Sequence, residues 1–446
     1  MIKRNIENKL HDWMENNRNA LLISGARQIG KTTTIRQFCK ENTKSYLELN
    51  MIENPEFVTM IQNAKGAADL LERFRIVSEN TLVKGESIIF LDEVQKVPEI
   101  ITMIKFLVDE GSYRYLLSGS LLGVELHNLR SAPVGYLSIL EMYPIDFYEF
   151  LLASGFSENT IASIKTCFNN SNEVDEFYHN KLMDLFYRYL IVGGMPQAVQ
   201  AYLDSGDIYA VRQIQKDIVN LYYLDFMQYA SSNGQLKIKS IYDRIPSELN
   251  KQNKRFVFAN ADKPVRFDRY ENSFLWLVNS GVAIATYNVE DLTSPLQQNR
   301  SSNLFKLYMS DVGLLNSFYS NQKLMRILNK DKDINNGALF ENVAAQQLLC
   351  NGHKTYFYRK KNIGEVDFVI DKDGYPTPIE IKSGKDYKIH SALKNLISRP
   401  NSQIKEAYVF ADTNVKKEGI INYLPIYMLM FLKETELEPI DLRIKI

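Results

Sequence analysis

Eight consecutive residues near the start of the chain have the types and order of a loop that binds phosphate groups. They are Gly25, Ala26, Arg27, Gln28, Ile29, Gly30, Lys31 and Thr32, and a helical stretch that begins at Thr33 follows them. Glycines let backbone N–H groups converge on phosphate oxygens at the amino terminus of a helix. We predict that residues 25–33 bind ATP, with Lys31 at the β- and γ-phosphates in a catalytic role and Thr32 as a ligand of Mg²⁺. A chance glycine-rich turn is the alternative.

Two acids follow the fully apolar run at residues 88–91 and could complete this site. They are Asp92 and Glu93. In a parallel sheet, the carboxyl end of a central strand faces the nucleotide. We predict that Asp92 holds magnesium through water and that Glu93 orients or deprotonates the attacking water. The alternative is that Asp92 only caps the next helix.

A further strand-like run, residues 113–117, ends in two serines. Ser118 and Ser120 flank a glycine there. A polar side chain at this edge could sense the γ-phosphate of ATP, but Ser-Gly-Ser is equally ordinary turn chemistry. Both interpretations stay open.

The pattern of apolar residues predicts four consecutive segments. Residues 1–155 alternate short β-rich runs with amphipathic stretches, which indicates an α/β domain with a parallel sheet. Residues 156–232 indicate a helical subdomain. In residues 233–328, short helices precede two strand-like pieces, an order that suits a winged helix. Residues 329–446 indicate a second, smaller α/β unit.

That last segment carries three acids and a lysine in a suggestive order. Asp367 lies on one predicted strand, Glu380 and Lys382 share a face of the next, and Glu341 lies on the preceding helix. The set resembles the metal-dependent nuclease fold of restriction and repair enzymes, in which carboxylates hold magnesium. We expect the three carboxylates to converge on a common metal point. A solvated charged hairpin and a nuclease fold without cleavage activity are the alternatives.

Basic residues crowd the segment that suits a winged helix. They are Lys237, Lys239, Lys251, Lys254, Arg255, Lys263, Arg266 and Arg269, with Phe256 and Phe258 interleaved. Such clustering could neutralise DNA phosphates. A surface that contacts a protein partner is the alternative, because charge runs are usually solvated faces.

Several motifs together resemble a family. They are residues 25–32, 91–95, 118–120, 143–150, 193–196 and 364–368, with Asp217 and Asp225. The chain resembles uncharacterised prokaryotic ATP-binding proteins of the AAA+ superfamily whose carboxyl half is domain of unknown function 4143. The resemblance implies an ATPase core, a helical lid, a winged helix and a restriction-endonuclease-like terminal domain. The Gly193-Gly194 break would let the lid swing or would form a simple tight turn.

Composition excludes several classes of protein. The 446 residues carry 53 Lys plus Arg and 53 Asp plus Glu, which removes any whole-molecule attraction to nucleic acid or an anionic membrane. No apolar run reaches the roughly 18 residues of a membrane span. The three cysteines are far apart, which argues against a disulfide framework and a thiolate metal site. We expect a cytoplasmic protein with no membrane partner.

These observations favour one function and leave two others open. The favoured one is a Mg²⁺-dependent ATPase whose nucleotide state controls carboxyl-terminal modules that act on DNA or a protein partner. The second is a Mg²⁺-dependent DNA nuclease gated by ATP. The third is a signalling switch that binds nucleotide and cuts nothing.

Overall fold

The chain folds as two compact units, each built from stretches that are not consecutive in sequence. The computed structural model describes residues 2–435 except 80, 121–132, 230–231, 258, 261–262, 265–268, 332–333, 385 and 401, so that Phe258 and Arg266 of the basic segment lie outside the described residues. Unit 1 comprises Met1–Ile145, Gly194–Tyr242 and Asp268–Ala283, and unit 2 comprises Asp146–Gly193, Asp243–Phe267 and Ile284–Ile446. These units differ from the four consecutive segments expected. In the described ranges, no helix is long and apolar enough to cross a membrane.

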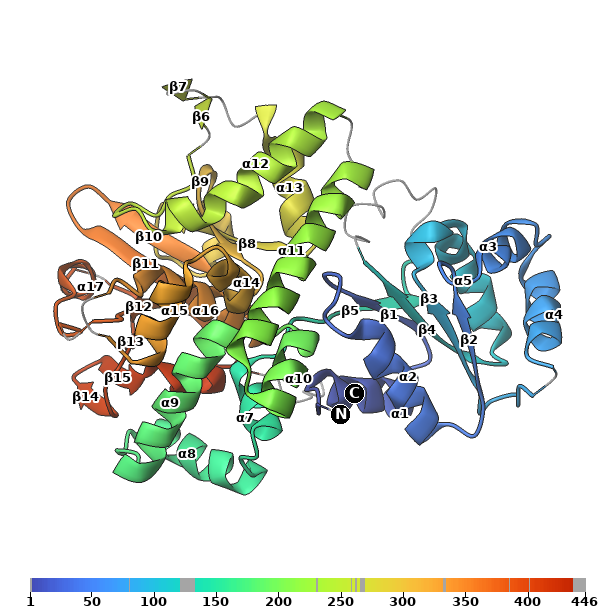
Figure 1. Cartoon of the computed structure of the whole chain (residues 1–446), viewed down its shortest axis with the longest axis horizontal. Coiled ribbons are helices and arrows are strands. Elements are labelled where there is room, and N and C mark those ends of the chain that lie inside the picture. The colour runs from blue at the N-terminus through green and yellow to red at the C-terminus, as the bar shows by residue number, and fades with distance from the viewer. Residues whose placement is uncertain are drawn as a thin grey trace, which may run out of the picture. The chain divides into compact units, whose positions relative to one another are not determined.

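Unit 1 is a parallel sheet covered by helices. Its elements are α1 (Ile6–Asn16), β1 (Ala20–Ser24), α2 (Lys31–Asn42), β2 (Tyr46–Asn50), α3 (Pro55–Gln62), α4 (Ala67–Val77), β3 (Ile88–Asp92), η1 (Val94–Lys96), α5 (Glu99–Glu110), β4 (Arg114–Gly119), β5 (Leu137–Glu141), α10 (Pro196–Ser205), α11 (Ile208–Tyr229), α13 (Glu271–Asn279) and α12 (Ser232–Leu249), which continues into unit 2 (Figure 1). The strands are ordered β2-β3-β4-β1-β5, and all pairs are parallel. The predicted α/β organisation of this part of the chain is confirmed.

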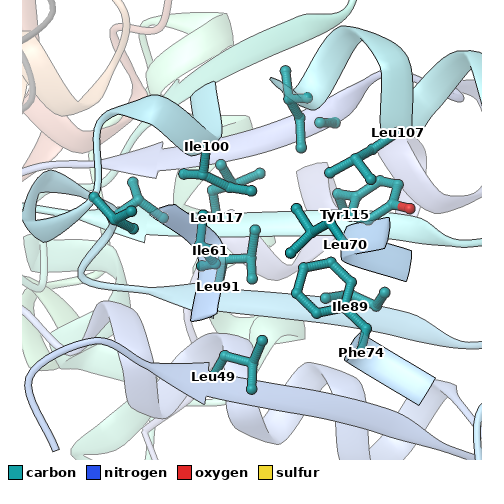
Figure 2. Packing of buried hydrophobic residues seen from close by; sticks show 14 of the residues in the cluster. Leu49, Ile61, Leu70, Phe74, Ile89, Leu91, Ile100, Leu107, Tyr115 and Leu117 are labelled. Carbon is teal, nitrogen blue, oxygen red and sulfur yellow. The ribbon is translucent and has the colours of Figure 1, made fainter. Parts of the chain in front are cut away.

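The alternation of apolar residues explains how the sheet is covered on both faces. Successive strand residues point to opposite faces, so Ala20 and Leu22 pack on one side while Leu21 and Ile23 pack on the other. Figure 2 shows the side that α3, α4 and α5 cover, where Phe74 of α4 lies beside the strand residues. Because β1, β3 and β4 are buried on both faces, their carboxyl ends are held rigidly at one edge.

Unit 2 contains a mixed sheet of eight strands. Its elements are α7 (Phe147–Ala153), α8 (Glu158–Asn170), α9 (Glu176–Val192), β6 (Ala259–Asn260), β7 (Lys263–Pro264), β8 (Ala283–Val289), η4 (Leu296–Asn299), β9 (Arg300–Met309), α14 (Val312–Ser317), α15 (Asn321–Leu328), α16 (Gly337–Cys350), β10 (Tyr356–Lys360), β11 (Gly364–Lys372), β12 (Tyr375–Ile381), α17 (Ser391–Ile397), β13 (Ala407–Ala411), β14 (Lys416–Glu418), β15 (Ile421–Pro425) and η5 (Ile426–Phe431). The strand order is β14-β15-β13-β12-β11-β10-β8-β9.

The two strands expected in the middle segment belong to this carboxyl-terminal sheet. β8 pairs in parallel with β10, with Tyr287 opposite Tyr356. β9 begins at Arg300 and is the last strand of the order, and its polar first residues suit an edge strand. Strands from residues 233–328 and strands from residues 329–446 therefore share one sheet.

The glycine break after α9 is a position of close backbone approach. Gly193 has a φ of +68°, and a Cβ on it would lie 2.3 Å from Asp311 Oδ1 and 2.6 Å from the Gly313 nitrogen. A Cβ on Gly194 would lie 2.0 Å from the Ile145 carbonyl oxygen. Both residues must therefore be glycine, and the boundary between the two units falls between them.

Candidate functional site

The predicted phosphate loop joins β1 to α2 in unit 1. Gly30 is the N-cap of α2, with a φ of +92°, so the helix amino terminus opens onto the loop. Gly25 has a φ of +148°, and a Cβ there would lie 2.3 Å from the Met142 carbonyl oxygen. The glycines at both ends of the loop are thus required by its shape, and the loop directs a helix amino terminus, a natural site for anions, at its centre.

Lys31 lies inside this loop. Its side chain is buried, and the ammonium donates to the carbonyl oxygens of Gly25 at 3.0 Å and Ala26 at 2.7 Å. Burial lowers the pKa of Lys31 to about 8, although the carboxylates of Glu93 and Asp92 act in the opposite direction. The side chain is therefore a cation at pH 7, positioned in the loop that would hold the phosphates, and it loses that charge in mildly alkaline solution.

Asp92 ends β3 beside the hydroxyl of Thr32. Thr32 Oγ1 lies 3.1 and 3.0 Å from the two carboxylate oxygens, and Asn50 Nδ2 donates to Oδ2 at 2.9 Å. Ser118 at the end of β4 also donates to Asp92. Burial raises the pKa of Asp92, and the bond from Ser118 partly offsets this effect. The hydroxyl and the carboxylate together form a pair of hard oxygen donors of the kind that Mg²⁺ prefers.

Glu93 is the first member of a chain of polar contacts. It has a φ of +58°, and its carboxylate accepts a hydrogen bond from Gln95. Gln95 Nε2 and Arg27 Nε each lie 3.2 Å from Ser120 Oγ. Arg27 in turn forms an ion pair with Asp225 on α11. The residue predicted to activate water is thus linked, through Gln95, Ser120 and Arg27, to a helix far along the sequence.

Two residues at this site, Arg4 and Asn50, escaped the sequence analysis, and a third, Gln95, was part of a motif but was given no role. Arg4 donates to the carbonyl oxygens of Ile29 at 3.0 Å and Tyr143 at 2.6 Å, which ties the loop to the start of the chain. Asn50 and Gln95 contact the two acids as described above. The position of Asn50 at the end of an apolar run was a usable signal, because parallel strands bring their carboxyl ends to one edge. Arg4 carried no such signal.

The predicted residues of the second site lie near one another in unit 2, on α16, β11 and β12 and, for Lys382, directly after β12. Asp367 Oδ2 accepts from the Ile381 nitrogen at 3.0 Å, and Lys382 forms an ion pair with Glu380 at 2.9 Å. Burial raises the pKa of Glu380 to about 8, and the neighbouring Asp367 adds to this effect. Glu380 is therefore mostly protonated at neutral pH.

The expected convergence of the three carboxylates on one metal point is not observed. Within the part of the chain that the structure describes, no three His, Cys, Asp or Glu side chains are placed to hold a metal ion. Glu341 instead pairs with Lys254, and a buried lysine, Lys306, lies between Glu341 and Asp367. The ion pairs explain the difference, because each of these carboxylates lies within ion-pair distance of a lysine of the chain.

The basic residues of the middle segment do not form one patch of unpaired cations. Lys251 pairs with Glu248 at 2.8 Å, and Lys254 pairs with Glu341. Lys237 donates to the carbonyl oxygen of Arg269 at 2.9 Å. The first two lysines belong to unit 2 and the third to unit 1. Contact with DNA therefore remains a prediction.

The fold and the loop define an ATP-binding domain of the AAA class. The chain carries an AAA domain at residues 17–151, followed by a domain of unknown function, DUF8612, at residues 183–324 and another, DUF4143, at residues 336–429. This confirms the resemblance to AAA+ proteins that carry domain of unknown function 4143. No curated protein matches the chain.

Three solved structures are similar to parts of the chain. The Walker-type ATPase PABY2304 of Pyrococcus abyssi is 14% identical, with a TM-score of 0.43, and the match covers 71% of this chain and 95% of that one. Cdc6p from Pyrobaculum aerophilum is 11% identical, with a TM-score of 0.26, covering 74% and 96%. The RuvB Holliday junction branch migration motor of Thermotoga maritima is 15% identical, with a TM-score of 0.27, covering 50% and 77%. These scores are low, so we infer function from the residues of the site.

Proposed function

We propose that the chain is a Mg²⁺-dependent ATPase of the AAA class. The observation that carries this proposal is the contact between Thr32 and Asp92. Lys31 precedes Thr32 in the chain, and Glu93 directly follows Asp92 at the end of β3. Hydrolysis needs a cation for the phosphates, oxygen donors for a metal and a base for water. Lys31 supplies the cation, Thr32 and Asp92 supply the oxygen donors, and Glu93 supplies the base.

Each of the four has a distinct part in the proposed reaction. The loop amides and Lys31 hold the β- and γ-phosphates, where the ammonium balances their charge. Thr32 and Asp92 would hold Mg²⁺, which supplies charge stabilisation at the phosphate oxygens. Glu93 accepts a proton from the attacking water, and the hydrogen bond from Gln95 sets the direction of its carboxylate.

Two substitutions test this division of roles. Lys31→Ala removes the phosphate cation and is expected to abolish ATP binding, measured with a fluorescent ATP analogue. Glu93→Gln keeps the shape of the side chain but removes the base, so ATP should bind normally while phosphate release falls by about 100-fold or more. Equal ATP affinity in the wild type and Lys31→Ala would contradict the proposal.

We further propose that the nucleotide state controls the rest of the chain. In this proposal, residues 156–232 form a helical lid, residues 233–328 form a winged-helix-like module, and residues 329–446 form a restriction-endonuclease-like module. The contact between Arg27 in the loop and Asp225 on α11 supports this coupling, because a bound phosphate would compete with the carboxylate for the guanidinium. ATP turnover should therefore change in Asp225→Asn while ATP is still bound. Unchanged turnover would show that the contact between Arg27 and Asp225 does not affect ATP hydrolysis.

Duplex DNA is our proposed partner for the basic middle segment. Arg255 and Arg359 both donate to Asn253 Oδ1, at 2.6 and 3.4 Å, so two guanidinium groups lie side by side and could bind one phosphate. The full-length chain should bind duplex DNA weakly, and affinity should fall steeply with salt. Binding that is absent at low salt, or insensitive to salt, would identify the segment as a solvated or protein-facing surface.

A further inference from the structure

One lysine in unit 2 is completely buried among carboxylates. Lys306 on β9 has no exposed side-chain surface, and its ammonium lies 2.9 Å from Glu365 Oε1, 3.7 Å from Glu341 Oε2 and 3.8 Å from Asp367 Oδ1. The three acids come from two elements, α16 and β11. A single cation thus contacts two of the residues predicted to hold a metal, together with a third acid.

Burial of this charge requires strong compensation. Moving an ammonium from water into a protein interior is strongly unfavourable unless other charges neutralise it. Burial opposes the charged form of Lys306, but Tyr308 and the three carboxylates outweigh it and hold the pKa of this lysine well above its ordinary value. The Nζ atom makes no well-directed hydrogen bond to any residue that the structure describes, and it lies 5.2 Å from the centroid of the Phe357 ring. Charge, rather than directed bonding, holds it there.

Two further lysines also pair with acids of the cluster. Lys254 pairs with Glu341, and Lys382 pairs with Glu380. Glu380 also shares a hydrogen bond with Asp367. Four cations of the chain therefore lie within ion-pair distance of the four acids, since Arg359 also lies 3.9 Å from Glu365. A divalent metal would have to displace an ammonium that is already paired, and it would bring excess positive charge.

We propose that Lys306 is the resident cation of this carboxylate cluster and that it occupies the position a divalent metal would need, so that unit 2 takes up no metal and cleaves no phosphodiester. This inference is independent of ATP hydrolysis in unit 1. It opposes the ATP-gated nuclease hypothesis and accounts for the absence of a common metal point among the described carboxylates.

The wild-type chain provides the first test. Mn²⁺ is titrated into the full-length, nucleotide-free protein, and bound metal is measured by the loss of the free-ion electron paramagnetic resonance signal. The same titration is made on Asp367→Asn, which lacks one carboxylate of the cluster. The two proteins should bind the same amount of Mn²⁺. A binding site present in the wild type and lost in Asp367→Asn would overturn the proposal.

A second test removes the resident cation. Lys306→Met keeps the length of the side chain but removes its charge, and this variant should bind one additional Mn²⁺ per chain. The double variant Lys306→Met with Asp367→Asn should lose that additional site. If Lys306→Met keeps the wild-type circular dichroism spectrum and gains no Mn²⁺, the proposal fails. If that variant does not fold, the wild-type titration alone decides.

Lys254→Met is the matched control, because Lys254 also pairs with Glu341 but does not lie among all three acids. It should gain less Mn²⁺ than Lys306→Met. An equal gain in the two variants would show that any lost lysine charge opens the cluster, which would contradict the specific position assigned to Lys306.

Discussion

At the scale of single residues, Gln95 holds the carboxylate that we propose as the base. The hydrogen bond from Gln95 fixes the direction in which the Glu93 carboxylate lies. Gln95→Leu keeps the volume of this buried side chain and removes the hydrogen bond. We expect basal ATP turnover to fall by about tenfold, with ATP affinity unchanged, in a phosphate-release assay. Turnover equal to or above that of the wild type, in a folded variant, would show that Glu93 does not depend on Gln95 for its position.

The lowered pKa of Lys31 makes ATP binding depend on pH. The ammonium of the free protein loses its proton as the pH rises through about 8, whereas bound phosphates would keep it charged. ATP affinity should therefore be constant below pH 7 and fall by about tenfold between pH 7 and pH 9. Lys31→Arg stays charged over this range and should show a flat profile, even if it binds more weakly. A flat wild-type profile would contradict the assignment of Lys31 to the phosphates.

At the scale of elements, helices α9 and α10 both end at a glycine, but only the glycine after α9 is closely surrounded by other atoms. A Cβ added to Gly193 would have backbone and carboxylate atoms within 2.7 Å, whereas a Cβ on Gly206, at the end of α10 with a similar φ of +67°, would meet no described atom within 4 Å. Gly206→Ala should therefore lower the free energy of unfolding by about 1 kcal/mol, from backbone strain alone. Gly193→Ala adds a steric clash and should cost at least about 3 kcal/mol. Chemical denaturation of both variants measures the difference, and equal costs would mean that the surroundings of Gly193 adjust freely.

At the scale of the whole molecule, the two units divide the chemistry. The loop, Asp92 and Glu93 belong to unit 1, and the carboxylate cluster belongs to unit 2. A ligand stabilises only the part that binds it, by about 2.7 kcal/mol at a hundred times its Kd. In calorimetry, ATP with Mg²⁺ should shift one unfolding transition, and Lys31→Ala should abolish this shift. Asp367→Asn should leave the shift intact, and its loss in that variant would show that the two sites are coupled.

The sequence by itself determined the local features of this protein. Eight adjacent residues specify the loop, because the glycines, Lys31 and Thr32 act within one turn between a strand and a helix. The apolar run at residues 88–91 agrees with β3, in which every residue is buried. The motifs also identified the AAA domain correctly.

Tertiary structure alone decided which distant residues meet. Arg27 and Asp225 are 198 positions apart, and no local pattern pairs them. The charged strand residues Asp367 and Glu380 suggested a metal site, but Lys306, on a strand assigned to another segment, lies in the same cluster. Alternation along a strand gives the face on which a side chain lies, whereas strand order in the folded sheet decides which side chains share that face. That order depends on packing across the whole unit, so the cation that fills the cluster could be found only in the folded chain.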